Sequence, residues 1–346
     1  MARIAFIACN KRADLYDRDP SFVYRCMNLA YGVKKHGHEV WCGHLKQFAW
    51  HLAWDVVVFH RPRSAWRLNL LMYWLRRRGV RVLADVDDLI MNPELARFSP
   101  GVVNGLVSLS KTQKLFRTHY KALDAVSGIS VSTSPLAAQV HALWPDMPMV
   151  VVPNALHHEW LHRKPAEQGG AAPVLAYMSG TRSHDRDFAM ITPVLERVLR
   201  RHPHAQLKVT GPLNISLNAR SGQVIQQEKL LFKDYYRCFD DVTVNLAPLE
   251  QSPFTQCKSA LKVIEAAWWN IPTICSELPD AERLNGAGAL CAHTADDFEE
   301  HLENVLIIAK YNNNKYDKIL RDRIQPLADI SSTSRIWLNF ALTISV

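Results

Sequence analysis

Short apolar runs alternate with longer amphipathic segments over the first 155 residues of this 346-residue chain. The runs have the length of buried strands, whereas the segments between them have the length and the period of helices. Strands that alternate with helices are typical of parallel βαβ units. The pattern predicts an open α/β sheet with strands near 3–8, 40–42, 55–59, 80–84, 125–130 and 149–152 and helices at 22–35, 65–78 and from about 135.

The alternation restarts after 164–173, a stretch rich in Pro, Gly, Ala and Gln that is typical of a linker. We therefore predict two facing Rossmann-like domains, residues 1–155 and 170–328, and an amphipathic segment at 329–346 that can return to the first domain. Ligands of open α/β sheets bind beyond the carboxyl ends of the strands, so we expect the site in the cleft between the domains. The second series has expected strands at 174–178, 206–210, 242–246 and 273–275 and helices at 187–201, 259–269 and 296–309.

The composition limits the class of protein and of partner. A formal charge of +8 indicates an anionic partner. Seven scattered cysteines without a C-x-x-C pair are typical of reduced thiols in a cytoplasmic protein, and the histidines lack metal-ligand spacing, so we expect no metal site. The apolar runs are too short to span a bilayer, and the N-terminal run is typical of a strand and not of a signal peptide. The absence of G-x-G-x-x-G and of a P-loop motif argues against nicotinamide and P-loop chemistry.

The segment from Leu246 to Glu277 is the most informative part of the sequence. A strand, a polar loop and a helix that we expect to begin near Lys258 and Ser259 follow one another. On a helical period Lys258, Lys262 and Glu265 share one face, and the first turn of a helix favours an anion such as a phosphate. Glu265 can accept hydrogen bonds from the paired hydroxyls of a ribose. A solvated Lys/Glu face is the alternative interpretation.

This segment resembles the donor-binding helix of group 1 GT-B glycosyltransferases, which use sugar nucleotides. Bacterial members read K-S-x-x-K-x-x-E followed by a turn such as G-I-P, and here Lys258, Ser259, Lys262 and Glu265 precede 270–272, Asn-Ile-Pro. The resemblance implies that Lys258 and Ser259 contact the donor diphosphate and that Glu265 binds the ribose. The family signature has a further Glu eight residues before the second, and Cys257 stands there in this chain.

Further stretches extend the resemblance through the second half of the chain. Residues 177–181, Tyr-Met-Ser-Gly-Thr, resemble the first strand and glycine turn of the donor domain. The resemblance implies that the backbone at Gly180 and Thr181 approaches the diphosphate and that Arg186 helps neutralise it. His184 follows the glycine turn, so we expect it to line the cleft. Residues 150–154 resemble the entry into the second domain, and 240–248 resemble the strand before the donor helix.

Three carboxylates follow the expected strand at 80–84, namely Asp85, Asp87 and Asp88. Like charges that are crowded together raise one pKa, which poises a general acid or base, so Asp87 and Asp88 are the predicted catalytic residues and Asp85 is expected to line the cleft. A helix N-cap is the alternative. Asp85 and Asp87 also form a D-x-D motif, which in metal-dependent GT-A glycosyltransferases holds Mn²⁺ or Mg²⁺ on the donor, and this is the alternative enzyme class.

Seven arginines and no acid lie between Arg61 and Arg81, interleaved with Trp and Leu. Such a segment suits the headgroup region of an anionic membrane, where an acceptor on a lipid carrier is found. A core helix with an exposed basic edge is the alternative. No nucleic-acid-binding module is recognisable, so we expect no nucleic acid partner.

Taken together, the residues and the resemblance predict a glycosyltransferase that moves a sugar from a nucleotide-diphosphate sugar to a glycan or lipid-linked acceptor. The resemblance implies retention of the anomeric configuration. We expect the enzyme to need no cofactor, because Lys258, Arg186 and the helix N-terminus can stabilise the leaving diphosphate without a metal. The expected location is the cytoplasm, at the inner face of the membrane. The competing hypothesis is a degenerate GT-B protein that binds a membrane or a partner without catalysis.

Overall fold

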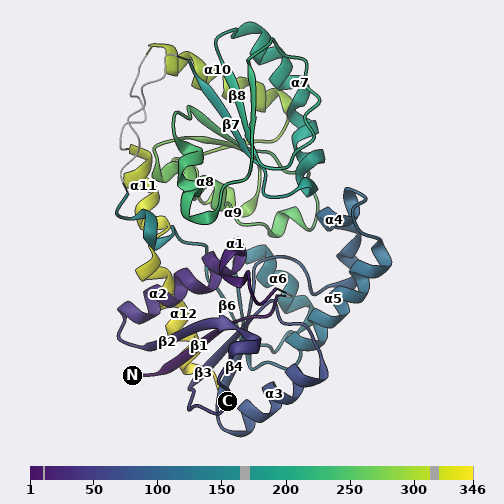
Figure 1. Cartoon of the computed structure of the whole chain (residues 1–346), viewed down its shortest axis with the longest axis vertical. Coiled ribbons are helices and arrows are strands. Elements are labelled where there is room, and N and C mark those ends of the chain that lie inside the picture. The colour runs from purple at the N-terminus through teal and green to yellow at the C-terminus, as the bar shows by residue number, and fades with distance from the viewer. Residues whose placement is uncertain (11, 164–171, 312–318, 346) are drawn as a thin grey trace. The chain divides into compact units, whose positions relative to one another are not determined.

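The computed structural model describes residues 1–10, 12–163, 172–311 and 319–345. These residues form two compact units. The first unit comprises Met1–His158, Cys257–Ser259 and Ala328–Val346, and the second comprises Glu159–Gln256 and Ala260–Leu327. Each unit contains one six-stranded sheet with helices packed on it (Figure 1), which confirms the predicted α/β class. Most of the expected linker, 164–171, lies outside the described residues.

The first unit is built on a parallel sheet with the strand order β2-β1-β3-β4-β5-β6. Because β1 has β2 on one side and β3 on the other, the direction of winding reverses between β1 and β3, and such a switch point is where α/β sheets bind ligands. The strands are β1 (Arg3–Ala8), β2 (Glu39–His44), β3 (Val56–His60), β4 (Arg81–Val86), β5 (Gly128–Val131) and β6 (Met149–Val151). The helices are α1 (Pro20–Phe22), α2 (Asn28–Lys35), α3 (Trp66–Arg77), α4 (Pro100–Val103), α5 (Leu109–Leu123), α6 (Ser134–Leu143) and α12 (Ile330–Thr343).

The C-terminal helix α12 belongs to the first unit and packs along α2. Its Trp337 is fully buried and lies with its ring centroid 5.1 Å from that of Phe6 in β1. The close approach of the two helices requires a glycine, because a Cβ on Gly32 would lie 2.5 Å from Ser334 Oγ. The aromatic contact and the small residues together hold the end of the chain on this sheet.

The second unit has a parallel sheet with the order β12-β11-β10-β7-β8-β9. The winding reverses between β7 and β10, so the loops that follow these two strands lie at the switch point. The strands are β7 (Val174–Met178), β8 (Gln206–Thr210), β9 (Val224–Gln227), β10 (Val244–Ala247), β11 (Thr273–Ser276) and β12 (Ala289–Ala292). The helices are α7 (Asp185–Arg201), α8 (Leu261–Trp268), α9 (Pro279–Glu282), α10 (Ala295–Tyr311) and α11 (Ile319–Leu327).

The expected strands of both series are confirmed within a few residues, whereas some short or polar elements were not predicted. These are β9 and β12, each four residues long, and α5, in which many polar residues make the apolar period difficult to recognise in the sequence. The predicted helix at 22–35 is interrupted by a π-helical turn at Val23–Met27, a kind of distortion that often occurs at functional sites. Arg25 lies in this turn, and its side chain is buried in the first unit.

Two of the buried histidines in the first unit, His119 and His157, have a strongly lowered pKa. His119 is 2% exposed, and its Nδ1–H donates to the carbonyl oxygen of Pro62 over 2.7 Å. Burial and the charge of Arg63 lower the pKa of His119 to about 3. Burial and the neighbouring His158 lower the pKa of His157 to about 3. Both side chains are therefore neutral in the folded protein at neutral and mildly acidic pH.

Because these histidines stay neutral in the fold, we expect the protein to become less stable as the pH is lowered. Below about pH 6.5 the unfolded chain protonates His119 while the folded chain does not, so between about 6.5 and 3 lowering the pH favours unfolding. From pH 7 to pH 5 the loss is about 2 kcal/mol for each such histidine. Urea unfolding of His119→Asn at the two pH values should show a pH difference smaller by that amount, whereas the exposed His51→Asn should retain it. An unchanged difference in His119→Asn would show that His119 is protonated in the fold.

Candidate functional site

The glycine turn after β7 lies at the switch point of the second unit. Ser179 N donates to Thr210 O over 2.8 Å, and Ser179 Oγ donates to Thr181 O over 2.8 Å. On the other side of the turn, Gly211 has φ +108°, and a Cβ there would lie 2.0 Å from Ser179 O, so only glycine is tolerated. At Gly180, by contrast, a Cβ would meet no atom within 4 Å. The side of Gly180 that would carry a Cβ therefore faces open space, while Gly180 O accepts a hydrogen bond from Lys229 Nζ over 3.2 Å.

Arg186 and His184 lie near this turn, at the start of α7. Arg186 Nη2 donates to Glu250 Oε1 over 2.7 Å, and Glu250 in the loop after β10 donates its own N–H to Asp187 Oδ1 over 2.9 Å. His184 Nδ1 and Asp187 Oδ2 lie 2.8 Å apart. These contacts tie the loop after β7 to the loop after β10. The side chain of Arg186 is 55% exposed, so its guanidinium remains accessible to an anion.

Helix α8 brings Lys262 and Glu265 to the same strand end. Lys262 Nζ donates to Met178 O, the last residue of β7. Tyr235 OH donates to Glu265 Oε2 over 3.3 Å and contacts Met178 Sδ over 3.4 Å. Glu265 is 4% exposed, and burial together with the charge of Glu265 raises the pKa of Tyr235 well above its usual value. Lys262 and Glu265 are thus gathered around Met178, next to the glycine turn.

The prediction that Lys258 and Ser259 lie in the first turn of this helix is wrong. Helix α8 begins at Leu261, because Ala260 has non-helical angles and donates its N–H to Asp280 Oδ2 over 2.7 Å. Lys258 and Ser259 group with the first unit. There Lys258 Nζ lies 2.7 Å from Asp88 Oδ1, and Asn154 Nδ2 donates to Ser259 Oγ over 2.7 Å. Lys258 is therefore paired with a carboxylate of the first unit, and Ser259 is held by Asn154 of the same unit.

The first unit has a buried ion pair at the end of β4. Arg25 and Asp85 side chains are each 2% exposed, with Arg25 Nη2 2.8 Å from Asp85 Oδ1. Ser130 Oγ also donates to Asp85 Oδ1 over 2.8 Å, and His60 Nδ1 lies 3.2 Å from Asp85 Oδ2. Burial acts to raise the pKa of Asp85, but the charge of Arg25 and the hydrogen bonds from His60 and Arg25 outweigh it and lower the pKa. Asp85 is therefore a charged anchor of the core.

A second group of ion pairs surrounds the other two carboxylates. Arg61 Nε lies 2.5 Å from Asp87 Oδ1, and Arg61 Nη2 lies 2.6 Å from Asp88 Oδ2. Ser21 Oγ donates to Asp87 Oδ2 over 2.6 Å and is itself 2.8 Å from His60 Nε2. Arg61 has φ +47°, a conformation that is strained for a side-chain-bearing residue and that is retained because these contacts fix it.

The expectation that crowding raises a pKa in this cluster is wrong. Burial and the charge of Asp87 do act to raise the pKa of Asp88, but the charges of Lys258 and Arg61 lower it. Burial likewise raises the pKa of Asp87, and the charges of Arg61 and His60 and the hydrogen bonds from Arg61 and Ser21 lower it. Each carboxylate thus has a cationic partner, so the cluster holds ionised groups in place. The catalytic roles of Asp87 and Asp88 stay a prediction.

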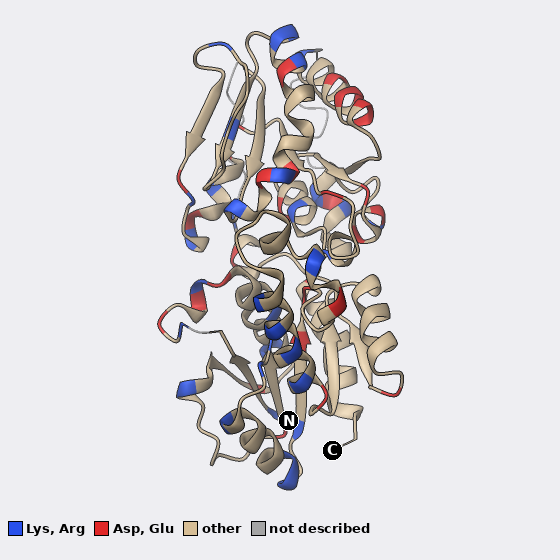
Figure 2. Ribbon diagram, turned by 90° about the vertical axis from the view of Figure 1, so that its right-hand side faces the viewer, with Lys and Arg blue, Asp and Glu red and all other residues tan. Residues whose placement is uncertain are grey.

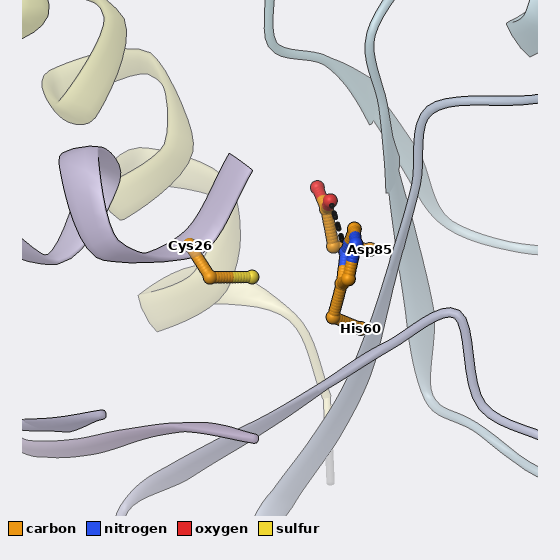
Figure 3. Close-up of side chains that lie close together, drawn as sticks. All are labelled: Cys26, His60 and Asp85. Atoms are coloured by element: carbon orange, nitrogen blue, oxygen red, sulfur yellow. Dashed lines mark hydrogen bonds and ion pairs between the residues drawn. The ribbon is translucent and has the colours of Figure 1, made fainter. Parts of the chain in front are cut away.

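The same contacts decide how the acidic residues fit a metal ion. Cys26, His60 and Asp85 have potential ligand atoms within 4.8 Å of one another (Figure 3). However, Arg25 donates to both oxygens of Asp85, and burial raises the pKa of Cys26 well above its usual value. A guanidinium next to the carboxylate repels a cation, and a protonated thiol is a poor ligand. Neither this cluster nor the D-x-D motif, whose Asp85 is held by Arg25, fits a divalent cation.

Several residues of these networks were not identified from the sequence. Arg25, His60, Ser21 and Tyr235 carry no local motif, and each meets its partner across at least 25 positions of the chain. The sequence places Arg61 in a basic segment but does not indicate its ion pairs with Asp87 and Asp88. His60 is the last residue of β3, and β3 borders the switch point of the first sheet. Because ligands bind at such points, the strand order would have indicated His60 as a candidate site residue.

Comparisons with known proteins place the fold. No protein-family model matches the sequence, and no curated protein matches it. Among solved structures, sucrose-phosphate synthase from Thermosynechococcus elongatus is 13% identical, with 98% of each chain covered and a TM-score of 0.63. OtsA is 10% identical, with 100% of each chain covered and a TM-score of 0.62. These structures are GT-B glycosyltransferases.

The chain has a GT-B fold.

A third match is a point mutant of S. aureus TarM, solved in complex with fondaparinux, α-GlcNAc-glycerol and UDP. It is 11% identical with a TM-score of 0.58, and the alignment covers 82% of this chain and 55% of TarM, so this GT-B chain spans about half the length of TarM. Within the described part of the chain, none of the helices is both long enough and apolar enough to cross a membrane.

Proposed function

We propose that this GT-B protein is a glycosyltransferase that uses a nucleotide-diphosphate sugar. The observation that carries the proposal is the gathering of Lys262, Glu265 and the Gly180 turn at the switch point of the second unit. Open α/β sheets bind nucleotides at such a point. The sequence resemblance independently assigns the donor to the same residues, and TarM was solved with UDP.

In the proposed mechanism the second unit stabilises the leaving diphosphate. Lys262 supplies a positive charge close to the end of β7, and the accessible Arg186 exchanges Glu250 for a phosphate oxygen. The open space beside Gly180 lets the diphosphate approach the backbone of the turn closely. Glu265 binds the ribose hydroxyls, with Tyr235 holding its carboxylate. Fixed positive charge of this kind favours departure of the diphosphate without a metal.

The first unit is assigned to the acceptor, which we propose to be a glycan or a lipid-linked sugar. Asp87 and Asp88 are ionised and held by Arg61, so they act as hydrogen-bond acceptors that orient a hydroxyl group and not as a protonated acid. Lys258 contacts Asp88, and Ser259 accepts a hydrogen bond from Asn154, in the same unit. Retention of the anomeric configuration belongs to the proposal through the group 1 resemblance alone.

A GT-B protein that binds without catalysis is the second candidate, and one observation favours it. Cys257 occupies the position of the first Glu of the family signature, and burial with the charge of Asp88 raises the pKa of its thiol to about 12. A neutral thiol cannot replace a carboxylate toward the transferred sugar. Release of nucleoside diphosphate from a sugar nucleotide separates the candidates, because the enzyme turns the donor over and the binding protein does not.

A further inference from the structure

Helix α3 of the first unit has apolar residues on two opposite faces. Leu68, Met72 and Leu75 are buried at 4%, 1% and 0% exposure and pack toward the sheet. On the opposite side Trp66, Leu70 and Tyr73 are 71%, 59% and 61% exposed. Their spacing of four and three residues puts these three side chains in one stripe along the helix. The buried face accounts for the packing of α3, whereas the three stripe side chains stay largely exposed, and the guanidinium of Arg67 on the same helix lies 5.0 Å from the Trp66 ring.

The exposed stripe is enclosed by positive charge. Arg67 and Arg76 flank it, Arg77 continues it, and Arg78 follows the last turn, and all four side chains are exposed. Residues 56–84 contain no Asp or Glu. The lower end of the first unit, where Figure 1 places α3, carries several Lys and Arg segments in Figure 2. Trp50 adds a further ring at 51% exposure and packs edge-on against Trp74 of the helix at 4.9 Å.

We infer that this face of α3, the α3 stripe of Trp66, Leu70, Tyr73 and its arginines, docks on an anionic lipid bilayer. A Trp, a Leu and a Tyr beside arginines are the combination that inserts at the headgroup level, with the rings and the aliphatic chain among the acyl ends and the guanidinium groups on the phosphates. The lack of Asp and Glu in residues 56–84 leaves the exposed arginines of α3 as the charge that an anionic membrane requires. A nucleic acid would match the charge, but Leu70 offers it neither a stacking surface nor a hydrogen bond.

This inference goes beyond the proposed transfer reaction and does not depend on it, because binding to vesicles needs neither a donor nor an acceptor. If the acceptor is lipid-linked, docking through α3 would bring the first unit to its substrate. Wild-type protein that turns over the donor but does not bind anionic vesicles would contradict the docking alone. Wild-type protein that binds anionic vesicles but does not turn over the donor would contradict the proposed function alone.

Sedimentation of the full chain with vesicles tests the inference. Vesicles of phosphatidylcholine with about 30% phosphatidylglycerol should bind the protein, and pure phosphatidylcholine vesicles should bind it at least tenfold more weakly. We expect binding to fall further when the salt concentration is raised. The variant R76Q/R77Q/R78Q should bind about 100-fold more weakly, which corresponds to about 1 kcal/mol for each arginine. The variant W66S/L70S/Y73S should bind anionic vesicles at least tenfold more weakly than wild type, and its remaining binding should still weaken with added salt.

A matched control removes three exposed cations from helix α5 of the same unit. The variant K111Q/K114Q/R117Q changes the net charge equally and should weaken binding less than threefold. Wild-type protein that ignores anionic vesicles, or α3 variants that bind like the α5 control, would overturn the inference. Displacement from vesicles by an equal charge of double-stranded DNA, or a dimer in solution that W66S/L70S/Y73S abolishes, would assign the stripe to another partner. Circular dichroism of each variant confirms that it is folded.

Discussion

Replacement of Glu265 by alanine is expected to lower kcat/KM for the sugar nucleotide about 100-fold, which is about 3 kcal/mol. Glu265 is buried at the end of β7 and is the carboxylate proposed to accept hydrogen bonds from two ribose hydroxyls. A hydrogen bond to a charged group contributes about 1.5–3 kcal/mol. Because the ribose is bound equally before and during transfer, the loss should appear mainly in KM for the donor.

The variant Glu265→Gln separates recognition from folding. Glutamine keeps the shape of the side chain and an oxygen that accepts the hydrogen bond from Tyr235. Wild-type protein should bind a ribonucleoside diphosphate about tenfold more tightly than its 2′-deoxy analogue, and Glu265→Gln should lose most of this preference. Glu300→Ala, which changes an exposed carboxylate on α10 of the same unit, is the matched control and should behave as wild type. A preference for ribose that survives in Glu265→Gln would place the ribose elsewhere.

Replacement of Asp85 by asparagine is expected to destabilise the protein by about 3–5 kcal/mol. Asparagine leaves the guanidinium of Arg25 buried without its carboxylate, and it also alters the hydrogen bonds from Ser130 and His60. The lost charge cannot be compensated by water, because both side chains of the ion pair are 2% exposed. Calorimetric unfolding should show the change in the transition of the first unit.

The matched control for this prediction is Glu39→Gln in the same unit. Glu39 pairs with Arg3 at 2.7 Å, but the two side chains are 48% and 43% exposed, and pairs of this kind contribute at most about 1 kcal/mol. The double variant Arg25→Met with Asp85→Leu removes both charges and should recover much of the stability. If Asp85→Asn unfolded like Glu39→Gln, the buried pair would not be the anchor that the geometry indicates.

The sequence carries the fold through its apolar periodicity. Val174–Met178 and Gln206–Thr210 were predicted at their observed bounds, because buried parallel strands are short apolar runs between polar loops. The start of α8 was predicted two or three residues too early. Its N-terminus depends on Asp280, which lies twenty residues along the chain from Ala260 and leaves no local pattern. Long-range caps of this kind are visible only when the chain is folded.

The candidate site divides in the same way. Lys262 and Glu265 could be predicted because a helix repeat places them on one face. The ionisation of the acidic cluster could not be predicted, because the pKa values of its carboxylates depend on Arg25 and Arg61. These arginines lie 60 and 26 positions along the chain from the carboxylates that they contact. Counting nearby acids in the sequence predicts repulsion, whereas the folded chain supplies the cations that reverse it. Charge balance at a buried site is a property of the tertiary structure.

A nucleotide site in the second unit is tested by the melting temperature of the protein with UDP, GDP, dTDP, CDP or CMP, each in EDTA and in Mn²⁺. A ligand that binds only the folded state stabilises it by about 2.7 kcal/mol at 100 times its Kd. The account predicts that one nucleoside diphosphate raises the melting temperature equally in EDTA and in Mn²⁺, and that Glu265→Ala loses the effect. No shift with any nucleotide, or a shift that Glu265→Ala retains, would contradict a donor site in the second unit.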